Sequence, residues 1–486
     1  MLNFNELNKY RENNRIEAKK SIGGLPRDLW ETYSAFANTQ GGVILLGVEE
    51  LANKSLHALV LPDPERLIKE FWDTINNRKK VSVNILTDKN VQIVEAEGNR
   101  IIMIDVPRAN RTDKPVYLNN NPMTDTYRRN GEGDYHCTQE EIRNMLRDQA
   151  DVSQDSRGLE QLELDAFDYE SVRRYRIRRQ TLKPNHVWEN LDDVAFLHKL
   201  GCVGRSEDGK LHPTAAGVLM FGFEYEIVKE YPAYFLDYQE HDDKSTRWTD
   251  RIISSSGDWS GNLFDFYYRV YNRVTQIIKI PFKLEGDTRI EDTPVHKAMR
   301  EAIANSLIHA NYYDRRGLVI HRYPDSVNIA NPGGLRISIE DAVLGGISDP
   351  RNATLIKLFN MLDIGERSGS GLPDIYAVWE SQDWKTPVLE EQFNPDRTIL
   401  SLVLSQAKNK KVAIKSSDKE KLAISDTQKQ KIIDFITDNK VCKTKALSEL
   451  LGVTQARVRV LLSQLIADGY VVSEGENKNR TYRLKS

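Results

Sequence analysis

The chain has 486 residues, of which 40% are hydrophobic and 29% are charged, and its formal net charge is −3. This length exceeds what one hydrophobic core usually serves, so we expect several domains of ordinary globular composition. The three cysteines lie far apart and form no CxxC pair, so neither a zinc site nor a disulfide framework is indicated. No signal peptide or membrane-spanning apolar run is present, and we expect a cytoplasmic protein without membrane contact.

Residues 1–150 are expected to form one α/β unit. The pattern predicts a helix over Leu25–Gln40, which two glycines end, and then a buried strand over Val43–Val48. Three more strands are predicted over Val81–Leu86, Val91–Ala96 and Arg100–Val106. A short amphipathic helix over Gln139–Gln149 closes the unit.

Residues 151–290 are expected to form a connector region. Helices are predicted over Tyr169–Gln180, Glu189–Leu200 and Asn262–Gln276, and Leu211–Phe223 continues into a buried, strand-like apolar run. Five arginines make the first of these helices basic. A solvated helix face explains them most simply, and contact with nucleic acid or an acidic protein is the alternative.

A helix predicted over His296–Tyr312 carries two patterns at once. Apolar residues recur at three- and four-residue steps, and Glu301, Asn305 and His309 follow one another at four-residue steps. A carboxylate and an amide one turn apart suit a phosphate site, because the carboxylate polarises water and the amide oxygen binds Mg²⁺. A solvated polar face is the simpler explanation of the spacing alone.

Three glycine-containing loops follow that helix. The first contains Asn331, Gly333 and Gly334, the second contains two glycines before Arg351 and Asn352, and the third is the run of residues 366–372, ERSGSGL. Glycine lets the backbone approach a ligand closely, and exposed amides at a helix start suit phosphate. Strands predicted over Val319–Tyr323, Val327–Ile329 and Thr398–Val403 complete one sheet.

Taken in this order, the helix and loops resemble the GHKL (Bergerat-fold) ATP-binding domain, in the divergent branch found behind Schlafen/AlbA-like domains. The resemblance implies that Asn305 binds Mg²⁺ together with ATP and that Glu301 is the base of any hydrolysis. It implies that Asn331, where better-known members have Asp, borders the adenine pocket with Gly333. A structural role is the alternative for His309. The other residues implied to contact nucleotide are Arg351, Asn352, Ser368, Gly369 and Gly371.

The N-terminal residues 1–150 resemble the Schlafen/AlbA-like domain, through the run from Glu12 to Lys19, the run SAFANTQGGVILLGVEE from Ser34, and residues 127–131, YRRNG. In nuclease-active relatives, three acidic residues hold a divalent metal beside a basic residue. The resemblance implies that Glu12, Glu17 and Glu49 hold Mg²⁺ or Mn²⁺ and that Lys19 neutralises the scissile phosphate. A Glu/Lys ion pair on a strand face is the alternative.

A Lys-rich linker over residues 406–424 precedes a terminal domain over residues 425–486. Helices predicted over Gln428–Thr437, Thr444–Leu451 and Thr454–Ala467, followed by two strands and a polar turn, resemble a winged helix-turn-helix. The domain has eleven Lys and Arg against seven Asp and Glu, a net charge of +4. DNA contact, with a protein–protein module as the alternative, is predicted for Gln455, Arg457, Arg459, Lys478 and Arg480.

The sequence thus predicts a multidomain α/β (α+β) protein: a Schlafen/AlbA-like domain (1–150), a connector (151–290), a GHKL-type α/β sandwich (291–405), a linker (406–424) and a winged helix (425–486). Such proteins are often described as transcriptional regulators or RecG-like ATP-binding proteins. The predicted function is an ATP- and DNA-binding regulator, with homodimers or higher oligomers expected. One alternative is an ATP-controlled, metal-dependent nuclease of RNA or DNA in phage defence, and the other is an interaction scaffold with degenerate sites.

Overall fold

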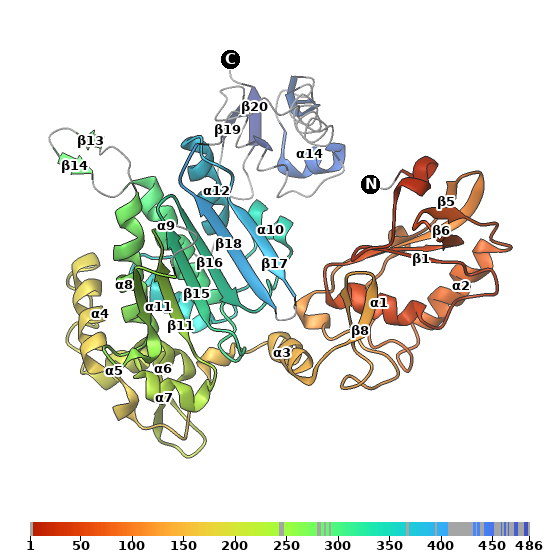
Figure 1. Ribbon diagram of the computed structural model, residues 1–486. Helices are drawn as coiled ribbons and strands as arrows, with labels where there is room; N and C mark the ends of the chain where they lie inside the picture. Colours follow the sequence, from red (N-terminus) through yellow and green to blue (C-terminus); the bar gives the residue numbers. More distant parts are fainter. Residues whose placement is uncertain are drawn as a thin grey trace.

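The computed structural model describes residues 3–242, 247–278, 283–285, 288–290, 293–365, 369–393 and 396–406, and then 431–433, 435–437, 442–451, 458, 461, 462, 465, 471–474 and 481–484. Figure 1 shows two α/β units on either side of helix α3 (Gln139–Gln149), with the described C-terminal elements above them. The predicted mixed α/β, multidomain class is confirmed.

The N-terminal unit is built on a sheet whose described strands have the order β1-β2-β6-β5. Strand β1 is parallel to β2, and the other neighbours are antiparallel. Two helices cover one face of the sheet, and their buried apolar residues share a cluster with those of the central strands. These elements are β1 (Ile16–Lys19), α1 (Leu29–Asn38), β2 (Gly42–Leu46), α2 (Pro64–Ile75), β5 (Val91–Ala96) and β6 (Asn99–Val106).

Two hairpins flank this sheet, β3 (Val48–Glu50) with β4 (Leu56–Ala58), and β7 (Tyr127–Asn130) with β8 (Gly133–His136). The side chain of Asn38, at the end of α1, joins the second hairpin to the helix. Its Nδ2 donates to the carbonyls of Val116 and Tyr127, and its Oδ1 accepts from the amide of Val116 at 2.8 Å. One buried amide therefore satisfies backbone groups that no ladder reaches.

The prediction of a strand over Val81–Leu86 was wrong, because these residues form only an isolated bridge between Val81 and Leu118. The hydroxyl of Tyr33 on α1 accepts from the amide of Ile85 at 3.0 Å and donates to the carbonyl of Val83 at 3.1 Å. It therefore occupies the backbone groups that a neighbouring strand would have used. Burial raises the pKa of this tyrosine to about 12.

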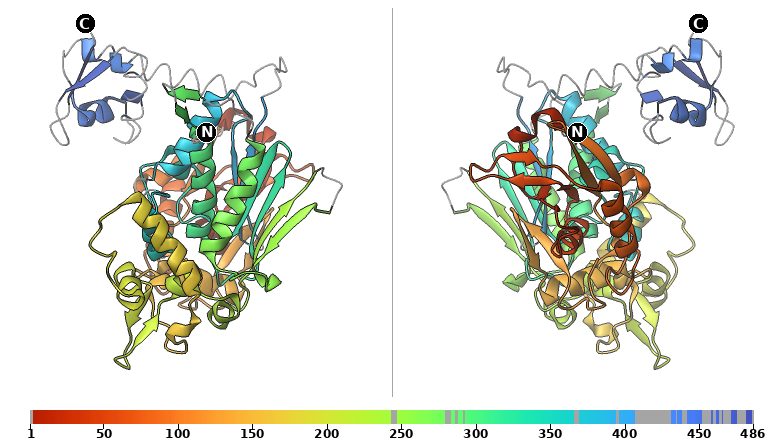
Figure 2. Two further views of the ribbon diagram at one scale, coloured as in Figure 1. Left: turned by 90° about the vertical axis from the view of Figure 1, so that its left-hand side faces the viewer. Right: turned by 90° about the vertical axis from the view of Figure 1, so that its right-hand side faces the viewer.

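The larger unit contains a sheet whose described strands have the order β12-β11-β15-β16-β18-β17. Burial alternates along β15, β16 and β18, so that one face of the sheet is covered and the other is open. Figure 2 shows the helices that cover it, with α9 and α8 nearest the sheet. The strands are β11 (Leu236–Glu240), β12 (Asp250–Ile253), β15 (Leu318–Tyr323), β16 (Ser326–Pro332), β17 (Val388–Gln392) and β18 (Arg397–Val403).

The helices of this unit largely confirm the predicted ones, with ends shifted by a few residues. The helix predicted over His296–Tyr312 is α9, Pro294–His309, which begins at Pro294 because proline is favoured in a first helical turn. The others are α4 (Tyr169–Leu182), α5 (Asp193–Leu200), α7 (Glu224–Glu230), α8 (Leu263–Val274), α10 (Ile339–Leu344), α11 (Ala353–Asn360) and α12 (Gly371–Ser381). Two short hairpins pair β9 (Val203–Arg205) with β10 (Leu211–Pro213), and β13 (Lys283–Glu285) with β14 (Thr288–Ile290).

The strand-like run predicted within Leu211–Phe223 is instead a helix, α6 (Ala215–Phe221). All seven of its residues are buried, and an apolar run buried on every side has no helical periodicity to reveal it. Thr214 caps its start by accepting from the amide of Gly217 at 3.2 Å. A Cβ on Gly217 would lie 2.2 Å from the carbonyl oxygen of Cys202, so the close packing of this helix requires glycine.

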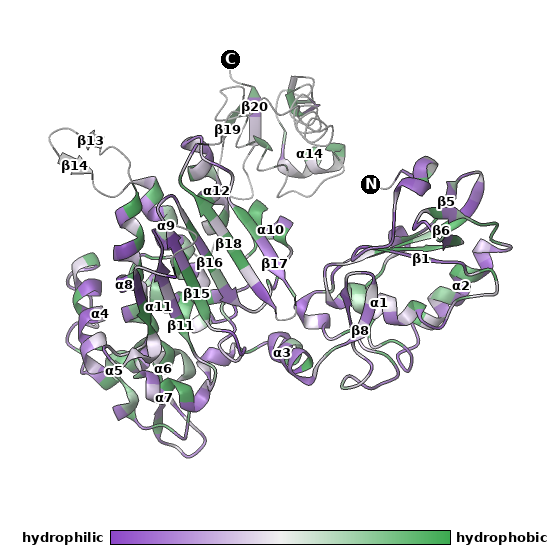
Figure 3. Cartoon of the chain, in the orientation of Figure 1, coloured by the Kyte–Doolittle hydropathy of each residue, from purple (hydrophilic) through white to green (hydrophobic). Residues whose placement is uncertain are grey.

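One hydrophobic core joins the connector to the sheet behind it. A single cluster of buried side chains runs from Leu159 to Leu402, and strands β11 and β12 of the connector extend the sheet of β15 to β18. The boundary predicted at residues 290/291 therefore does not coincide with a break in this core. Figure 3 shows the hydrophobic colouring concentrated in these strands and in the helices that face them.

The described C-terminal residues include α14 (Thr444–Leu451), as predicted, and an antiparallel hairpin of β19 (Val471–Glu474) and β20 (Thr481–Leu484). They share a small apolar core that includes Leu447, Val458 and Tyr482. Most of the predicted third helix lies outside the described residues. In the described part of the chain, no helix combines the length and the apolar character needed to cross a membrane.

Candidate nucleotide and metal sites

The polar stripe of α9 faces the start of another helix. Asn305 Nδ2 donates to Glu301 Oε1 at 3.1 Å, which orients the amide oxygen away from the carboxylate. A Cβ on Gly371, the first residue of α12, would lie 2.1 Å from Glu301 Oε1 and 2.9 Å from Asn305 Nδ2. The two helices therefore meet this closely only because residue 371 is glycine.

The loop before α12 is also shaped by glycines. Gly369 has a φ of +70°, and a Cβ there would lie 2.6 Å from the carbonyl oxygen of Ile347. The amide of Gly346 donates to the carbonyl of Gly369 at 3.2 Å, so the loops after α10 and before α12 pack on each other. Ser368, predicted to contact phosphate, lies outside the described residues.

A pocket with a volume of about 140 Å³ connects this stripe to the sheet. It contains Glu301, Asn305 and His309 from α9, as well as Gly369 and Gly371 from the loop. Asn331 reaches it from the end of β16, where it is 8% exposed and pairs in register with Thr398 of β18. Gly333 does not line this pocket, although its neighbour Gly334 does. The remaining walls are largely apolar, as in most small-molecule sites.

Arg351 and Asn352, which were predicted to contact nucleotide, form hydrogen bonds with other parts of the protein. Asn352 Nδ2 donates to the carbonyls of Ile308 and Ala310 at 2.8 and 2.9 Å, which satisfies the C-terminal end of α9. It does not line the pocket. Arg351 does line the pocket, but its guanidinium donates two hydrogen bonds to Asp148, at 2.9 and 3.0 Å. It also donates to the carbonyl of His309 at 2.5 Å.

His309 stands at the end of the stripe as a neutral side chain. Burial, with Arg351 and Arg336 nearby, lowers the pKa of its imidazole to about 4. A neutral imidazole carries no charge with which to attract phosphate. The geometry therefore favours the structural alternative for His309.

The chemistry of the donor set fits Mg²⁺–ATP. Asn305 presents an amide oxygen, the hard ligand that Mg²⁺ prefers, and Glu301 lies one turn away. The N-terminus of α12 brings backbone amides close to both of these side chains, because residue 371 is glycine. Asn331 lines the end of the pocket nearest the sheet, where the resemblance requires an adenine contact.

The carboxylates predicted to hold a metal ion in the N-terminal unit pair with groups of the protein. Glu17, 7% exposed, accepts from Arg129 Nη2 at 2.7 Å, and its other oxygen is 2.7 Å from Lys19. Lys19 is also 2.6 Å from Asp28. Glu12 accepts from the amide of Ala18 at 3.0 Å. Among the described residues no group of three or more His, Cys, Asp or Glu is arranged to hold a metal ion.

Glu50, rather than Glu49, is the third acid near this cluster. Glu49 forms an ion pair with Lys20 at 2.9 Å. Burial raises the pKa of Glu12, and the charges of Glu17 and Glu50 raise it further, which places these three carboxylates within electrostatic reach of one another. One Glu50 oxygen is buried without a hydrogen-bond partner. The two glutamates are neighbours in β3, where successive side chains point to opposite faces.

Two residues that the sequence did not single out hold the sites in place. Arg129, from the YRRNG run, links Glu17 to Asp134 with bonds of 2.7 and 2.9 Å. Asp148, from α3, accepts from both Arg336 and Arg351. The predicted DNA-contacting residues lie outside the described part of the chain: Gln455, Arg457, Arg459, Lys478 and Arg480.

Comparison with protein families finds three matching segments. Residues 12–138 match the model described as "Schlafen, AlbA_2", and residues 316–400 match "Putative ATP-dependent DNA helicase recG C-terminal". Residues 143–237, between them, match "Domain of unknown function (DUF8451)". The chain thus contains one segment similar to a Schlafen/AlbA domain and one similar to an ATPase-like domain. The matches indicate an ATP-binding, nucleic-acid-associated protein, as the sequence predicted. The ATPase-like match begins after α9, so the roles of Glu301 and Asn305 rest on geometry and resemblance.

Comparison with solved structures finds several similar chains, two of which follow. The crystal structure of the DIP2311 protein from Corynebacterium diphtheriae has 15% sequence identity, covers 97% of this chain and 92% of that one, and has a TM-score of 0.43. The NMR structure of the N-terminal domain of a RecG-related protein from Nitrosomonas europaea has 29% identity, covers 28% of this chain and 90% of that one, and has a TM-score of 0.22. No curated protein matches the chain.

Proposed function

We propose that this protein is a nucleotide-responsive regulator that binds nucleic acid, DNA in the first place, through its N-terminal and C-terminal segments. The observation that carries the proposal is the cradle at Gly371, where α12 begins against Glu301 and Asn305. In bound Mg²⁺–ATP, the phosphates would suit the helix amides and the cation would suit the Asn305 oxygen. Glu301 is the residue we assign to polarise a water, should hydrolysis occur.

A physical link supports a regulatory role. Arg336 and Arg351 line the nucleotide pocket, and both hold Asp148 on the last turn of α3, which leads from the N-terminal unit. A ligand with different affinities for two arrangements of these arginines shifts the balance between them. Nucleotide occupancy would in this way bias how the two units face nucleic acid.

Isothermal titration of the full chain with ATP and Mg²⁺ tests the nucleotide part. Asn305→Ala should weaken binding at least tenfold, because it removes a metal ligand and a group that orients Glu301. Ser381→Ala, on the last turn of α12, is a matched control. If the unaltered protein shows no heat of binding, the nucleotide part of the proposal is wrong.

Gel shifts with upstream DNA, with and without ATP, test the regulatory part. Arg457→Ala should weaken the complex, and ATP should change its affinity in the unaltered protein but not in Asn305→Ala. Light scattering in the same buffers tests the homodimer or higher oligomer that we propose for paired half-sites. An affinity that does not change with ATP would remove the regulatory claim.

The second candidate is a metal-dependent nuclease, favoured by the electrostatic coupling of Glu12 with Glu17 and Glu50. Carboxylates close enough to repel one another are what a divalent cation neutralises. Labelled tRNA and DNA incubated with Mn²⁺ or Mg²⁺ test it, with Glu50→Gln compared with Glu49→Gln. Cleavage lost in Glu50→Gln alone would establish the nuclease, and absence of cleavage by the unaltered protein would dismiss it.

A further inference from the structure

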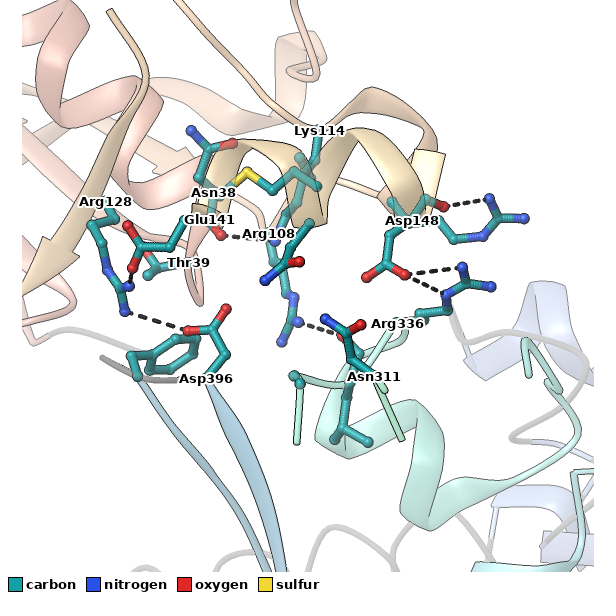
Figure 4. A pocket seen from close by; sticks show the side chains of 18 of the residues that line it. Asn38, Thr39, Arg108, Lys114, Arg128, Glu141, Asp148, Asn311, Arg336 and Asp396 are labelled. Carbon is teal, nitrogen blue, oxygen red and sulfur yellow. Dashed lines mark hydrogen bonds and ion pairs between the residues drawn. The ribbon is translucent and has the colours of Figure 1, made fainter. Parts of the chain in front are cut away.

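A second pocket lies between the two α/β units, next to the nucleotide pocket, with which it shares Arg336 and Arg351. It is lined by the end of α1, by α3, by residues 333–336, and by Arg108, Ala109, Arg111, Lys114, Phe393 and Asp396 (Figure 4). Its volume of about 70 Å³ is half that of the nucleotide pocket, and it suits a small hydrated ion.

The lining of this interdomain pocket has an excess of positive charge. Among the described residues that line it, six carry cationic side chains and three carry carboxylates. The carboxylates are Glu141, Asp148 and Asp396, and each lies beside an arginine of the lining. Glu391 and Asp349, just outside the lining, pair with Arg108 and Arg111 and reduce this excess.

Lys114 has no carboxylate partner among the described residues. Its ammonium donates to the carbonyl of Asn38 at 2.8 Å, which leaves two of its three donors for the pocket. Burial and the neighbouring charge of Arg108 lower the pKa of this lysine to about 7. An ammonium in such surroundings is stabilised by any anion that enters.

Arg128 is the second group with unused donors. It is 7% exposed, and although it contacts Glu141, its Nε and Nη2 have no hydrogen-bond acceptor among the described residues. Asp396 Oδ1 lies 3.5 Å from Nη2 without forming a hydrogen bond. Figure 4 shows Arg128 reaching from the N-terminal unit toward Asp396. Buried donors without acceptors are costly and point to a missing partner.

We propose that the interdomain pocket binds a small tetrahedral oxyanion, of which inorganic phosphate is the type, between Lys114 and Arg128. Arg108 adds charge but is itself occupied, because its guanidinium donates to both oxygens of Glu391 and to the carbonyl of Leu335. Lys114 and Arg128 both belong to the N-terminal unit, and residues of the larger unit, among them Arg336 and Arg351, line the rest of the pocket. This inference does not depend on the proposed function.

Binding of inorganic phosphate to the full chain is measured by titration calorimetry and by the melting temperature, against chloride at equal ionic strength. Phosphate should raise the melting temperature, because an ion that binds only the folded state stabilises it. Lys114→Met should weaken binding about tenfold or more, as expected for one charge-assisted hydrogen bond. Lys229→Met, an exposed lysine paired with Glu226, is the matched control and should bind as the unaltered protein does.

Two further variants keep the test decisive if Lys114→Met folds poorly. Asp396→Asn should bind phosphate several-fold more tightly, because it removes a carboxylate that repels the anion. Asn305→Ala should leave phosphate binding unchanged, because that residue belongs to the nucleotide pocket. The proposal is overturned if phosphate has no specific effect, if Asp396→Asn does not tighten binding, or if Asn305→Ala removes it.

Discussion

Gly371 decides whether α12 can begin against the polar stripe of α9. An alanine Cβ would lie 2.1 Å from Glu301 Oε1, a distance that real contacts do not reach. Gly371→Ala should therefore displace the helix start and weaken ATP binding at least tenfold, since the phosphate cradle depends on that approach. Calorimetric titration measures the affinity. Gly23→Ala is the control, because a Cβ there meets nothing within 4 Å. Equal ATP affinities for the two variants would disprove the cradle.

His309 should make stability depend on pH in a mildly acidic range. Its pKa is about 4 in the folded chain, against about 6.5 in an unfolded one. Between these values the unfolded chain binds more protons, so stability is complete above pH 6.5 and falls as the pH drops toward 4. The loss should amount to about 2–3 kcal/mol, and His309→Gln should flatten this part of the profile.

Denaturant unfolding at pH 7 and at pH 4.5 provides the measurement. The difference between the two pH values is compared in the unaltered protein and in His309→Gln, which cancels the contribution of the carboxylates. His198→Gln, at the end of α5, is a control from another helix. If His309→Gln shows the same loss as the unaltered protein, the imidazole is not buried in its neutral form.

At the scale of elements, α9 carries two functions that separate along its length. Asn352 satisfies the carbonyls of Ile308 and Ala310 at its end, and Asn305 faces the pocket from its middle. Asn352→Ala should cost about 2–3 kcal/mol of unfolding free energy, because two buried acceptors lose their donor. Asn305→Ala should cost less stability and more ATP affinity.

Thermal unfolding and ATP titration of both variants test this separation. Asn352→Ala should reduce stability more than ATP affinity, and Asn305→Ala should reduce ATP affinity more than stability. If Asn352→Ala keeps its stability but loses ATP binding, Asn352 contacts the nucleotide, as the family resemblance implies.

Elements with a clear period were predictable from the sequence, and those defined by distant contacts were not. The amphipathic helix Gln139–Gln149 and the strand Val91–Ala96 have the predicted bounds. Helix α6 has no polar face, so only its burial in the folded chain distinguishes it from a strand. Likewise, the spacing of polar residues predicted which side of α9 faces the pocket. Whether Glu49 or Glu50 lies near Glu12 and Glu17 depends instead on the register of a three-residue strand.

At the scale of the whole molecule, the two α/β units are joined by arginine–carboxylate pairs that no local pattern reveals. Arg108 pairs with Glu391, Arg111 with Asp349, and Arg128 contacts Asp396. The partners are more than 200 residues apart in sequence. Such pairs specify how the units dock, and partly buried ones are costly to break.

Asp148 is the centre of this junction, because it accepts from Arg336 at 3.0 Å and from Arg351 at 2.9 Å. The two guanidinium groups hold the pKa of its carboxyl well below the usual range, despite its burial. Asp148→Asn would leave both arginines without their shared carboxylate, so we expect a loss of about 3–5 kcal/mol in unfolding free energy or separation of the units. It should also abolish the effect of ATP on DNA affinity while ATP still binds.

Small-angle scattering of the full chain detects separation of the units, and paired titrations with ATP and DNA measure the coupling. Asp151→Asn, an exposed aspartate three residues away, is the matched control and should change none of these quantities. Separation that leaves the coupling intact would mean that nucleotide state is transmitted by another route. A compact Asp148→Asn variant without coupling would place the transmission in the two arginines themselves, since they line the nucleotide pocket and hold α3 at the same time.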